Sequence, residues 1–377
     1  MLFDPAPKSR REDLFDFEEE LETLLEAYRD DLTRMVVISG LRRTGKTSLL
    51  KVSLRESGLP HLIVDGRSVL GPEDLERTLT EGLRRIREGP LRRSLSRLRS
   101  LSTPVVGVEL DRLGEVRLQD ELREASSWAL ERGTRIVVAL DEVQDLRYVG
   151  WLPRILAFCY DNLHGILTVL TGSQVRLMEE FLGLRDPGSP LFGRPFAEVR
   201  TRTLSDREAR EFLEAGFVQA GVRCPSQALE DAVYSLGGVI GWLTYYGYQV
   251  LRTAGGRGEV GREVCDEALE RTYSYARSLL RSELRAFLEG RASAERRYRA
   301  VLSVLARAPG RVLDRAELRA RVEGLLEEKI PRPRFSRLLS ELERYGFIVS
   351  GEQGYRLADP LIALALEPSP EVGGLET

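Results

Sequence analysis

Residues 35–50 read MVVISGLRRTGKTSLL. The first six are mostly apolar, which predicts a short buried strand that ends at Gly40. From Gly40 to Thr47 the chain fits the pattern G-x-x-x-x-G-K-[ST], and helix-forming residues follow. Glycines at these places let backbone N–H groups curve around phosphates, and the positive end of the next helix faces them. We therefore interpret the stretch as a phosphate-binding loop (P-loop) rather than as a glycine-rich turn without a ligand.

The P-loop predicts which side chains bind a nucleotide. Lys46 is one of only four lysines, and it stands where a cation is needed for the β- and γ-phosphates. The Thr47 hydroxyl is the expected Mg²⁺ ligand. Arg42 and Arg43 either contact the nucleotide or a neighbouring subunit, or are simply solvated. The expected nucleotide-binding residues are Gly40, Arg42, Arg43, Thr44, Gly45, Lys46, Thr47 and Ser48.

A second apolar run, RIVVALDEVQDL at residues 135–146, contains two adjacent carboxylates. It matches a Walker B element, in which Asp141 belongs to the Mg²⁺ shell and Glu142 orients or deprotonates the attacking water. No Asn-Lys-x-Asp stretch for guanine recognition is present, and Asn162 is the sole asparagine. The P-loop and the Walker B element together predict an ATPase that uses ATP/ADP and Mg²⁺.

The apolar run LTVLTGSQ at residues 167–174 ends in polar side chains. Such a side chain can hydrogen-bond the γ-phosphate or the attacking water. Ser173 is the first candidate for this sensor and Thr171 is the second. The alternative for Ser173 is that it caps the following helix.

The loop DPGSPLFGR at residues 186–194 ends in an arginine. Arg194 is a candidate arginine finger, directed at its own γ-phosphate or at that of a neighbouring copy. The stiffening prolines and permissive glycines of the loop suit such a platform. The alternative is a structural arginine that bonds loop carbonyls or an acidic partner such as Asp186.

Apolar strands alternate with helical segments in the N-terminal half of the chain. Helices at 14–34, 73–87, 119–132 and 151–162 are expected between or beside the strands, and a β-hairpin insertion at about 100–118. The alternation predicts an α/β fold with a mostly parallel, doubly wound sheet, and residues 1–204 as one core domain. The predicted strands are 35–40, 61–66, 135–140, 165–173 and 197–204.

From Ser205 onward the pattern is helical, and residues 205–290 are expected to form a helical domain. A last domain at 291–366 shows three helices followed by a hairpin at 346–359, which is the order of a winged helix. Residues 367–377 are expected to be a flexible tail. The three helices are predicted at 296–307, 314–328 and 333–345.

The third of these helices carries arginines near its N-terminal end: Arg332, Arg334 and Arg337. A recognition helix meets double-stranded DNA at this end. Residues 291–359 hold 15 Arg and Lys against 10 Asp and Glu, a modest basic excess. The alternative is that the domain packs on the ATPase core or on protein partners. Glu341 and Glu343 on the same helix favour this alternative.

The amino-acid composition indicates which class of protein this is. With 42% hydrophobic and 31% charged residues among 377, the chain is typical of a soluble protein of two or three domains. We find no apolar run that could span a bilayer and no secretory signal, so we expect a cytoplasmic protein without membrane insertion. Three widely spaced cysteines and two histidines argue against a disulfide framework, a zinc site and histidine catalysis. The arginine-rich, asparagine-poor composition hints at a thermophile.

The segments GLRRTGKTSLL, LDEVQDL, LTGS, SPLFGR, LSDREAREFL and YRLADPLI, in this order, resemble the archaeal-type ATPase family, a branch of the AAA+/STAND P-loop ATPases. The resemblance covers about residues 12–366. It implies an ASCE-type, AAA+-like core, a small helical lid and a C-terminal winged helix, similar in plan to archaeal origin-recognition ATPases. Two segments depart from the family: the first helix reads FDFEEELETL without the usual Arg-Glu pair, and LGGVIGWL in the lid has no sensor-2 arginine.

These observations favour a Mg²⁺-dependent ATPase that acts as a nucleotide-controlled molecular switch with slow turnover and protein partners. The alternative is a DNA-binding ATPase of replication, repair or mobile elements that resembles origin-recognition proteins. A toxin or defence component is a third interpretation. An arginine finger at Arg194 that acts on a neighbour would require self-association.

Overall fold

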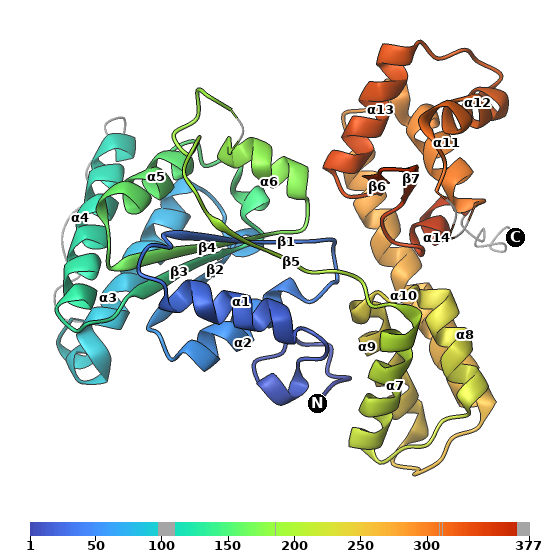
Figure 1. Cartoon of the computed structure of the whole chain (residues 1–377), viewed down its shortest axis with the longest axis horizontal. Coiled ribbons are helices and arrows are strands. Elements are labelled where there is room, and N and C mark those ends of the chain that lie inside the picture. The colour runs from blue at the N-terminus through green and yellow to red at the C-terminus, as the bar shows by residue number, and fades with distance from the viewer. Residues whose placement is uncertain (97–109, 185, 309, 311, 368–377) are drawn as a thin grey trace, which may run out of the picture. The chain divides into compact units, whose positions relative to one another are not determined.

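A computed structural model describes residues 1–96, 110–184, 186–308, 310 and 312–367 (Figure 1). The chain divides into two compact units. The sheet unit consists of Pro7–Gly40 and Gly45–Arg202. The helical unit consists of Met1–Ala6, Leu41–Thr44 and Thr203–Thr377, so four residues from inside the P-loop group with it.

The sheet unit is built on five parallel strands in the order β2-β3-β4-β1-β5. The α/β fold with a parallel sheet is thereby confirmed, and all five predicted strands are present. The strands are β1 (Met35–Ser39), β2 (His61–Asp65), β3 (Ile136–Asp141), β4 (Ile166–Gly172) and β5 (Ala197–Arg200). The helices are α1 (Glu18–Arg29), α2 (Lys46–Ser57), α3 (Pro72–Ser96), α4 (Leu110–Leu130), α5 (Leu152–Asn162) and α6 (Val175–Leu182).

Helices cover both faces of this sheet. The β1-to-β2 connection runs toward one edge of the sheet, whereas the later connections run the other way. With right-handed crossovers, α2 must then lie on the opposite face from α5 and α6, as Figure 1 shows. Every residue of β1, β3 and β4 is buried, which explains why these strands are continuous apolar runs without polar alternation.

The predicted β-hairpin at 100–118 is wrong from Leu110 onward, because this part is the first half of α4. Residues 100–109 lie outside the described part of the chain. Asp111 and Gly114 are residue types that are common in turns, but an isolated glycine is also tolerated within a helix. Leu118 and Leu122, four residues apart, are both buried in the core and continue the helical pattern.

The helical unit contains eight α-helices and one antiparallel hairpin in its described residues. Its helices are α7 (Asp206–Ala220), α8 (Ser226–Leu236), α9 (Ile240–Ala254), α10 (Arg262–Leu288), α11 (Glu295–Ala306), α12 (Arg315–Leu326), α13 (Arg332–Arg344) and α14 (Ile362–Leu366). Its strands are β6 (Ile348–Gly351) and β7 (Gly354–Leu357). The three helices and the hairpin predicted after residue 290 are therefore present in the predicted order.

Helix α10, with 27 residues, is the longest of the helices in this unit. It packs against α9 and also against α14. The expected division at residue 290 into a lid and a winged helix stays a prediction. Of the predicted tail, residues 368–377 lie outside the described residues. Among the described helices, none is both long and apolar enough to cross a membrane.

Candidate nucleotide site

The P-loop connects the end of β1 to the start of α2. Gly40 and Gly45 have φ angles of 152° and 87°, a backbone conformation that favours glycine, which explains why glycine stands at these two positions of the P-loop. Lys46 is buried, and its Nζ donates to the Gly40 carbonyl at 3.1 Å. The N-terminus of α2 has no side-chain cap, so its first N–H groups can bind an anion.

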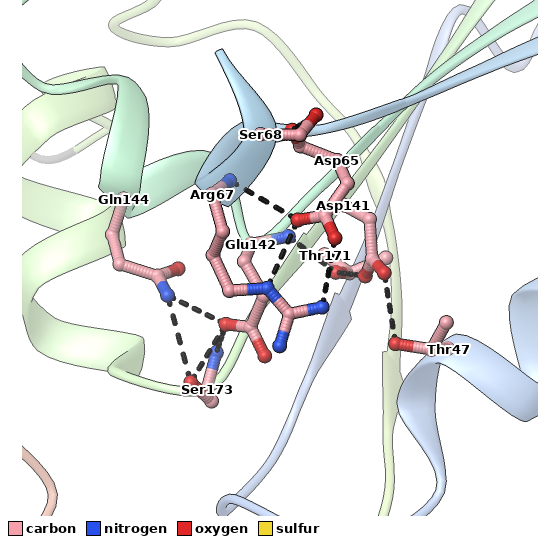
Figure 2. Close-up of polar contacts among 9 residues, drawn as sticks. All are labelled: Thr47, Asp65, Arg67, Ser68, Asp141, Glu142, Gln144, Thr171 and Ser173. Atoms are coloured by element: carbon pink, nitrogen blue, oxygen red, sulfur yellow. Dashed lines mark hydrogen bonds and ion pairs between the residues drawn. The ribbon is translucent and has the colours of Figure 1, made fainter. Parts of the chain in front are cut away.

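Asp141 lies at the end of β3 and is buried. Its Oδ2 accepts a hydrogen bond from Thr47 Oγ1 at 2.8 Å, and its Oδ1 accepts one from Thr171 Oγ1 (Figure 2). The two residues predicted to ligate Mg²⁺ are thus in direct contact. A hydroxyl and a carboxylate oxygen are hard ligands of the kind that Mg²⁺ prefers, so the donor set fits this ion.

Glu142 follows directly in a left-handed conformation with φ of 52°. Its Oε2 accepts from Ser173 Oγ at 2.7 Å, from Ser173 N at 3.1 Å and from Gln144 Nε2 at 2.5 Å (Figure 2). Burial acts to raise the pKa of Glu142, but the charge of Lys46 and these hydrogen bonds outweigh it and hold the pKa below its usual value. Among the described residues, no hydrogen bond reaches Oε1. An ionised Glu142 with one oxygen fixed is suited to orient a water molecule.

Both sensor candidates contact the Walker B carboxylates. Thr171 Oγ1 donates to Asp141 and accepts from the Glu142 backbone N–H at 3.0 Å. The Ser173 hydroxyl donates to Glu142, and α6 begins after Gln174, so Ser173 does not cap this helix. The structure therefore brings Thr171 and Ser173 to the site, one on each carboxylate.

Residues 14–245 match the family described as an ATPase domain predominantly from Archaea, which is more than half of the chain. The chain belongs to this family. The archaeal-type ATPase is also similar to a solved Walker-type ATPase of Pyrococcus abyssi, at 31% identity, with a TM-score of 0.76 and coverage of 97% of this chain and 99% of that chain. The Aeropyrum pernix ORC2 protein shares the fold at 16% identity, with a TM-score of 0.62 and coverage of 97% and 96%. No curated protein matches the chain.

The sequence-based prediction missed the contribution of the end of β2 to this edge of the sheet. Asp65 at the end of β2 is the register partner of Asp141, and it accepts from Arg67 Nε and NH2 at 2.9 Å each (Figure 2). Burial raises the pKa of Asp65, but the Arg67 hydrogen bonds leave it below its usual value. A Cβ at Gly66 would lie 2.7 Å from the Glu142 carbonyl oxygen, so only glycine fits this turn. In the sequence, Asp65, Gly66 and Arg67 directly follow the apolar residues of this strand. This acidic strand end was the signal from which Asp65 could have been predicted.

The Arg194 side chain is held inside the sheet unit of this archaeal-type ATPase. Its Nε and NH2 donate to Asp161 in the last turn of α5, at 2.9 and 2.6 Å, and its NH1 donates to the Pro190 carbonyl. These contacts match the alternative that Arg194 is a structural arginine bonded to a loop carbonyl and an acidic partner, although that partner is Asp161. Asp186 instead accepts from the Gly188 N–H at 2.9 Å within the loop. A role as an arginine finger stays a prediction.

Arg42, Arg43 and Ser48, which were also predicted to bind the nucleotide, each contact other parts of the protein. Within the helical unit, Arg42 and Arg43 each pair with Glu283, so the interpretation that they are simply solvated is wrong. In the sheet unit, Ser48 Oγ accepts from the Lys8 N–H at 3.0 Å. Whether Arg42, Arg43 and Ser48 contact a nucleotide stays a prediction.

The candidate DNA-binding arginines lie on α13 in the helical unit. Arg332, Arg334 and Arg337 are exposed, and none makes a hydrogen bond or ion pair with the described residues. The two acidic residues on the same helix that favoured protein contacts both have partners within the helical unit. Glu341 pairs with Arg291 at 3.2 Å, and Glu343 accepts a hydrogen bond from the Ser350 hydroxyl. The basic end of α13 is therefore open to a partner.

Proposed function

We propose that this protein binds ATP with Mg²⁺, hydrolyses it slowly, and uses the nucleotide state as a molecular switch. The observation that carries the proposal is the contact between Thr47 at the start of α2 and Asp141 at the end of β3, with Glu142 fixed beside them. Membership of an ATPase family and the similarity to a Walker-type ATPase support it.

Each residue has a task in an in-line attack on the γ-phosphate. The first N–H groups of α2 and the Lys46 ammonium bind the phosphates. Thr47 and Asp141 supply oxygen ligands to Mg²⁺, which neutralises charge on the phosphate oxygens when bound. Glu142 orients the attacking water through Oε1 while Ser173 and Gln144 hold Oε2. Glu142 thereby orients the attacking water or accepts its proton.

The substitution Glu142→Gln tests this assignment. We expect ATP affinity close to that of the wild type and a turnover at least about 100-fold lower, since an amide orients water poorly. The matched control is Glu56→Gln, an exposed carboxylate on α2, which should behave as the wild type. Turnover of Glu142→Gln at the wild-type rate would remove the role of Glu142, and a wild-type protein that binds no ATP would end the proposal.

A second candidate function is an ATPase that acts on duplex DNA. The exposed, unpaired arginines of α13 favour it, and α11 to α13 with the β6–β7 hairpin fit a winged helix. ATP turnover measured over a range of protein concentrations, with and without duplex DNA, separates the candidates. Stimulation by DNA favours the second, and a specific activity that rises with concentration indicates self-association.

A further inference from the structure

The P-loop contains a backbone conformation that its own sequence does not explain. Arg43 has a φ of 63°, in the left-handed region that disfavours residues with a Cβ. Such a residue persists only where its surroundings hold it. Arg43 belongs to the segment Leu41–Thr44, which groups with the helical unit, so its surroundings come from residues far along the chain.

The main chain at Arg43 is held by the start of α9. The Gly241 N–H donates to the Arg43 carbonyl at 3.0 Å. A Cβ added to Gly241 would lie 2.8 Å from Arg43 Cβ and 3.2 Å from its carbonyl oxygen. Gly241 is thus required for close backbone packing, and this packing fixes the direction of the Arg43 peptide group.

The side chains of the P-loop arginines meet one carboxylate of α10. Arg43 NH2 lies 2.7 Å from Glu283 Oε1, and Arg42 NH1 lies 2.6 Å from Glu283 Oε2. The Arg43 guanidinium also lies over the Trp242 ring, 4.4 Å from its centroid. Only 16% of the Arg43 side chain is exposed, so these contacts are shielded from solvent screening.

Asp359, between β7 and α14, completes the cluster. Its Oδ2 accepts from Trp242 Nε1 at 2.7 Å and lies 3.7 Å from Arg43 NH1, and its Oδ1 accepts from the Leu361 N–H at 2.9 Å. Burial raises the pKa of Asp359 although Arg43 and the Trp242 hydrogen bond act the other way. Asp359 therefore fixes both Trp242 and Arg43 from the C-terminal end of the chain.

We infer that Asp359 and Glu283 are positioning residues for the P-loop: acting through Arg43, they hold the loop in the conformation that binds phosphates. Nucleotide affinity then depends on side chains that lie 240 positions or more from the P-loop. The inference rests on the proposed function, because it concerns the same nucleotide. It does not involve Asp141 or Glu142, so its effect should fall on affinity more than on turnover.

The substitution Asp359→Asn removes one charge from the cluster and nearly preserves its shape. We expect the dissociation constants of fluorescent ADP and ATP analogues to rise about tenfold, because the strain at Arg43 is no longer compensated. The loss of turnover at saturating ATP should be smaller than the loss of affinity. Glu283→Gln, at a partly exposed position, should also raise the dissociation constants. It replaces Asp359→Asn in the test if that variant folds poorly.

A second substitution separates positioning of the loop from general support of the fold. Glycine adopts a positive φ without help, so in an Arg43→Gly background Asp359→Asn should cause no further loss of affinity. Losses that simply add in the double variant would overturn the inference. The control Glu341→Gln breaks the Arg291 ion pair elsewhere in the helical unit and should leave affinity unchanged.

The outcomes also distinguish this inference from the proposed function. A wild-type protein that binds neither nucleotide contradicts the proposed function. A wild-type protein that binds both, with Asp359→Asn and Glu283→Gln equally tight, contradicts only the role of the cluster. Thermal unfolding of each variant, followed by circular dichroism, shows that the compared proteins are folded.

Discussion

Two groups of charged side chains in this protein have opposite surroundings. At the carboxyl end of the sheet, Asp141 and Glu142 are enclosed, and hydroxyl, amide and backbone donors hold them in place. On α13, Arg332, Arg334 and Arg337 are exposed, and none of them makes a hydrogen bond or an ion pair with the described residues. Removing a donor from a buried carboxylate costs about 1–3 kcal/mol, whereas an exposed charge contributes little to stability. The enclosed group is thus organised before a ligand arrives, and the exposed group is available to one.

The largest effect is expected for Lys46→Ala at the enclosed site. Loss of the ammonium group should abolish detectable nucleotide binding, because no other lysine lies in the loop to offset the phosphate charge. Isothermal titration calorimetry with ATP and Mg²⁺ measures the affinity of the variant and of the wild type. Lys51→Ala, on the same helix, should bind normally. If Lys46→Ala binds ATP as tightly as the wild type, the P-loop interpretation is wrong.

A smaller effect is expected for Thr171→Val. Valine keeps the shape but removes the donor to Asp141 and the acceptor for the Glu142 N–H. We expect about 1–3 kcal/mol lower unfolding free energy and a clear loss of turnover. Thr168→Val, on the same strand and bonded to the Arg34 carbonyl, is the control that should lower stability alone. Equal turnover in the two variants would show that Thr171 is structural.

On the exposed side, the triple substitution of the α13 arginines by alanine should leave stability and ATP turnover unchanged. If the protein binds duplex DNA through α13, the salt dependence of binding should decrease by about 2 to 3 in log–log slope. An equal decrease in a control variant would show that only net charge matters. The control replaces three exposed arginines of the helical unit outside α13: Arg207, Arg223 and Arg257.

The smallest effect is expected for Arg194→Ala. The Arg194–Asp161 ion pair is partly exposed, so its loss should cost only about 0–1 kcal/mol. Asp161→Ala removes the same pair from the other side and should match it in a thermal melt. A large loss of turnover in Arg194→Ala, without one in Asp161→Ala, would instead establish an arginine finger.

The strand pattern and the two motifs could be predicted because each depends on neighbouring residues. Apolar runs predicted all five strands, and Asp141 and Glu142 come directly after the apolar residues 136–140 in the sequence. The prediction of a hairpin was wrong because turn-forming residues also occur inside helices. Here the buried side of α4 continues past them, as the buried Leu118 shows. Asp65 and Gly66 were missed because only the pairing of β2 with β3 brings them beside the Walker B carboxylates.

The sequence by itself determined the parallel sheet, the P-loop and the acidic strand end, because local spacing sets backbone conformation and parallel strands converge at one edge. Only the tertiary structure decided which partner each charged side chain has. Arg194 pairs with Asp161, and Arg43 pairs with Glu283 and Asp359, across separations that no local pattern encodes. The physical reason is that ion pairs and hydrogen bonds act over a few ångströms in space, whatever the distance along the chain.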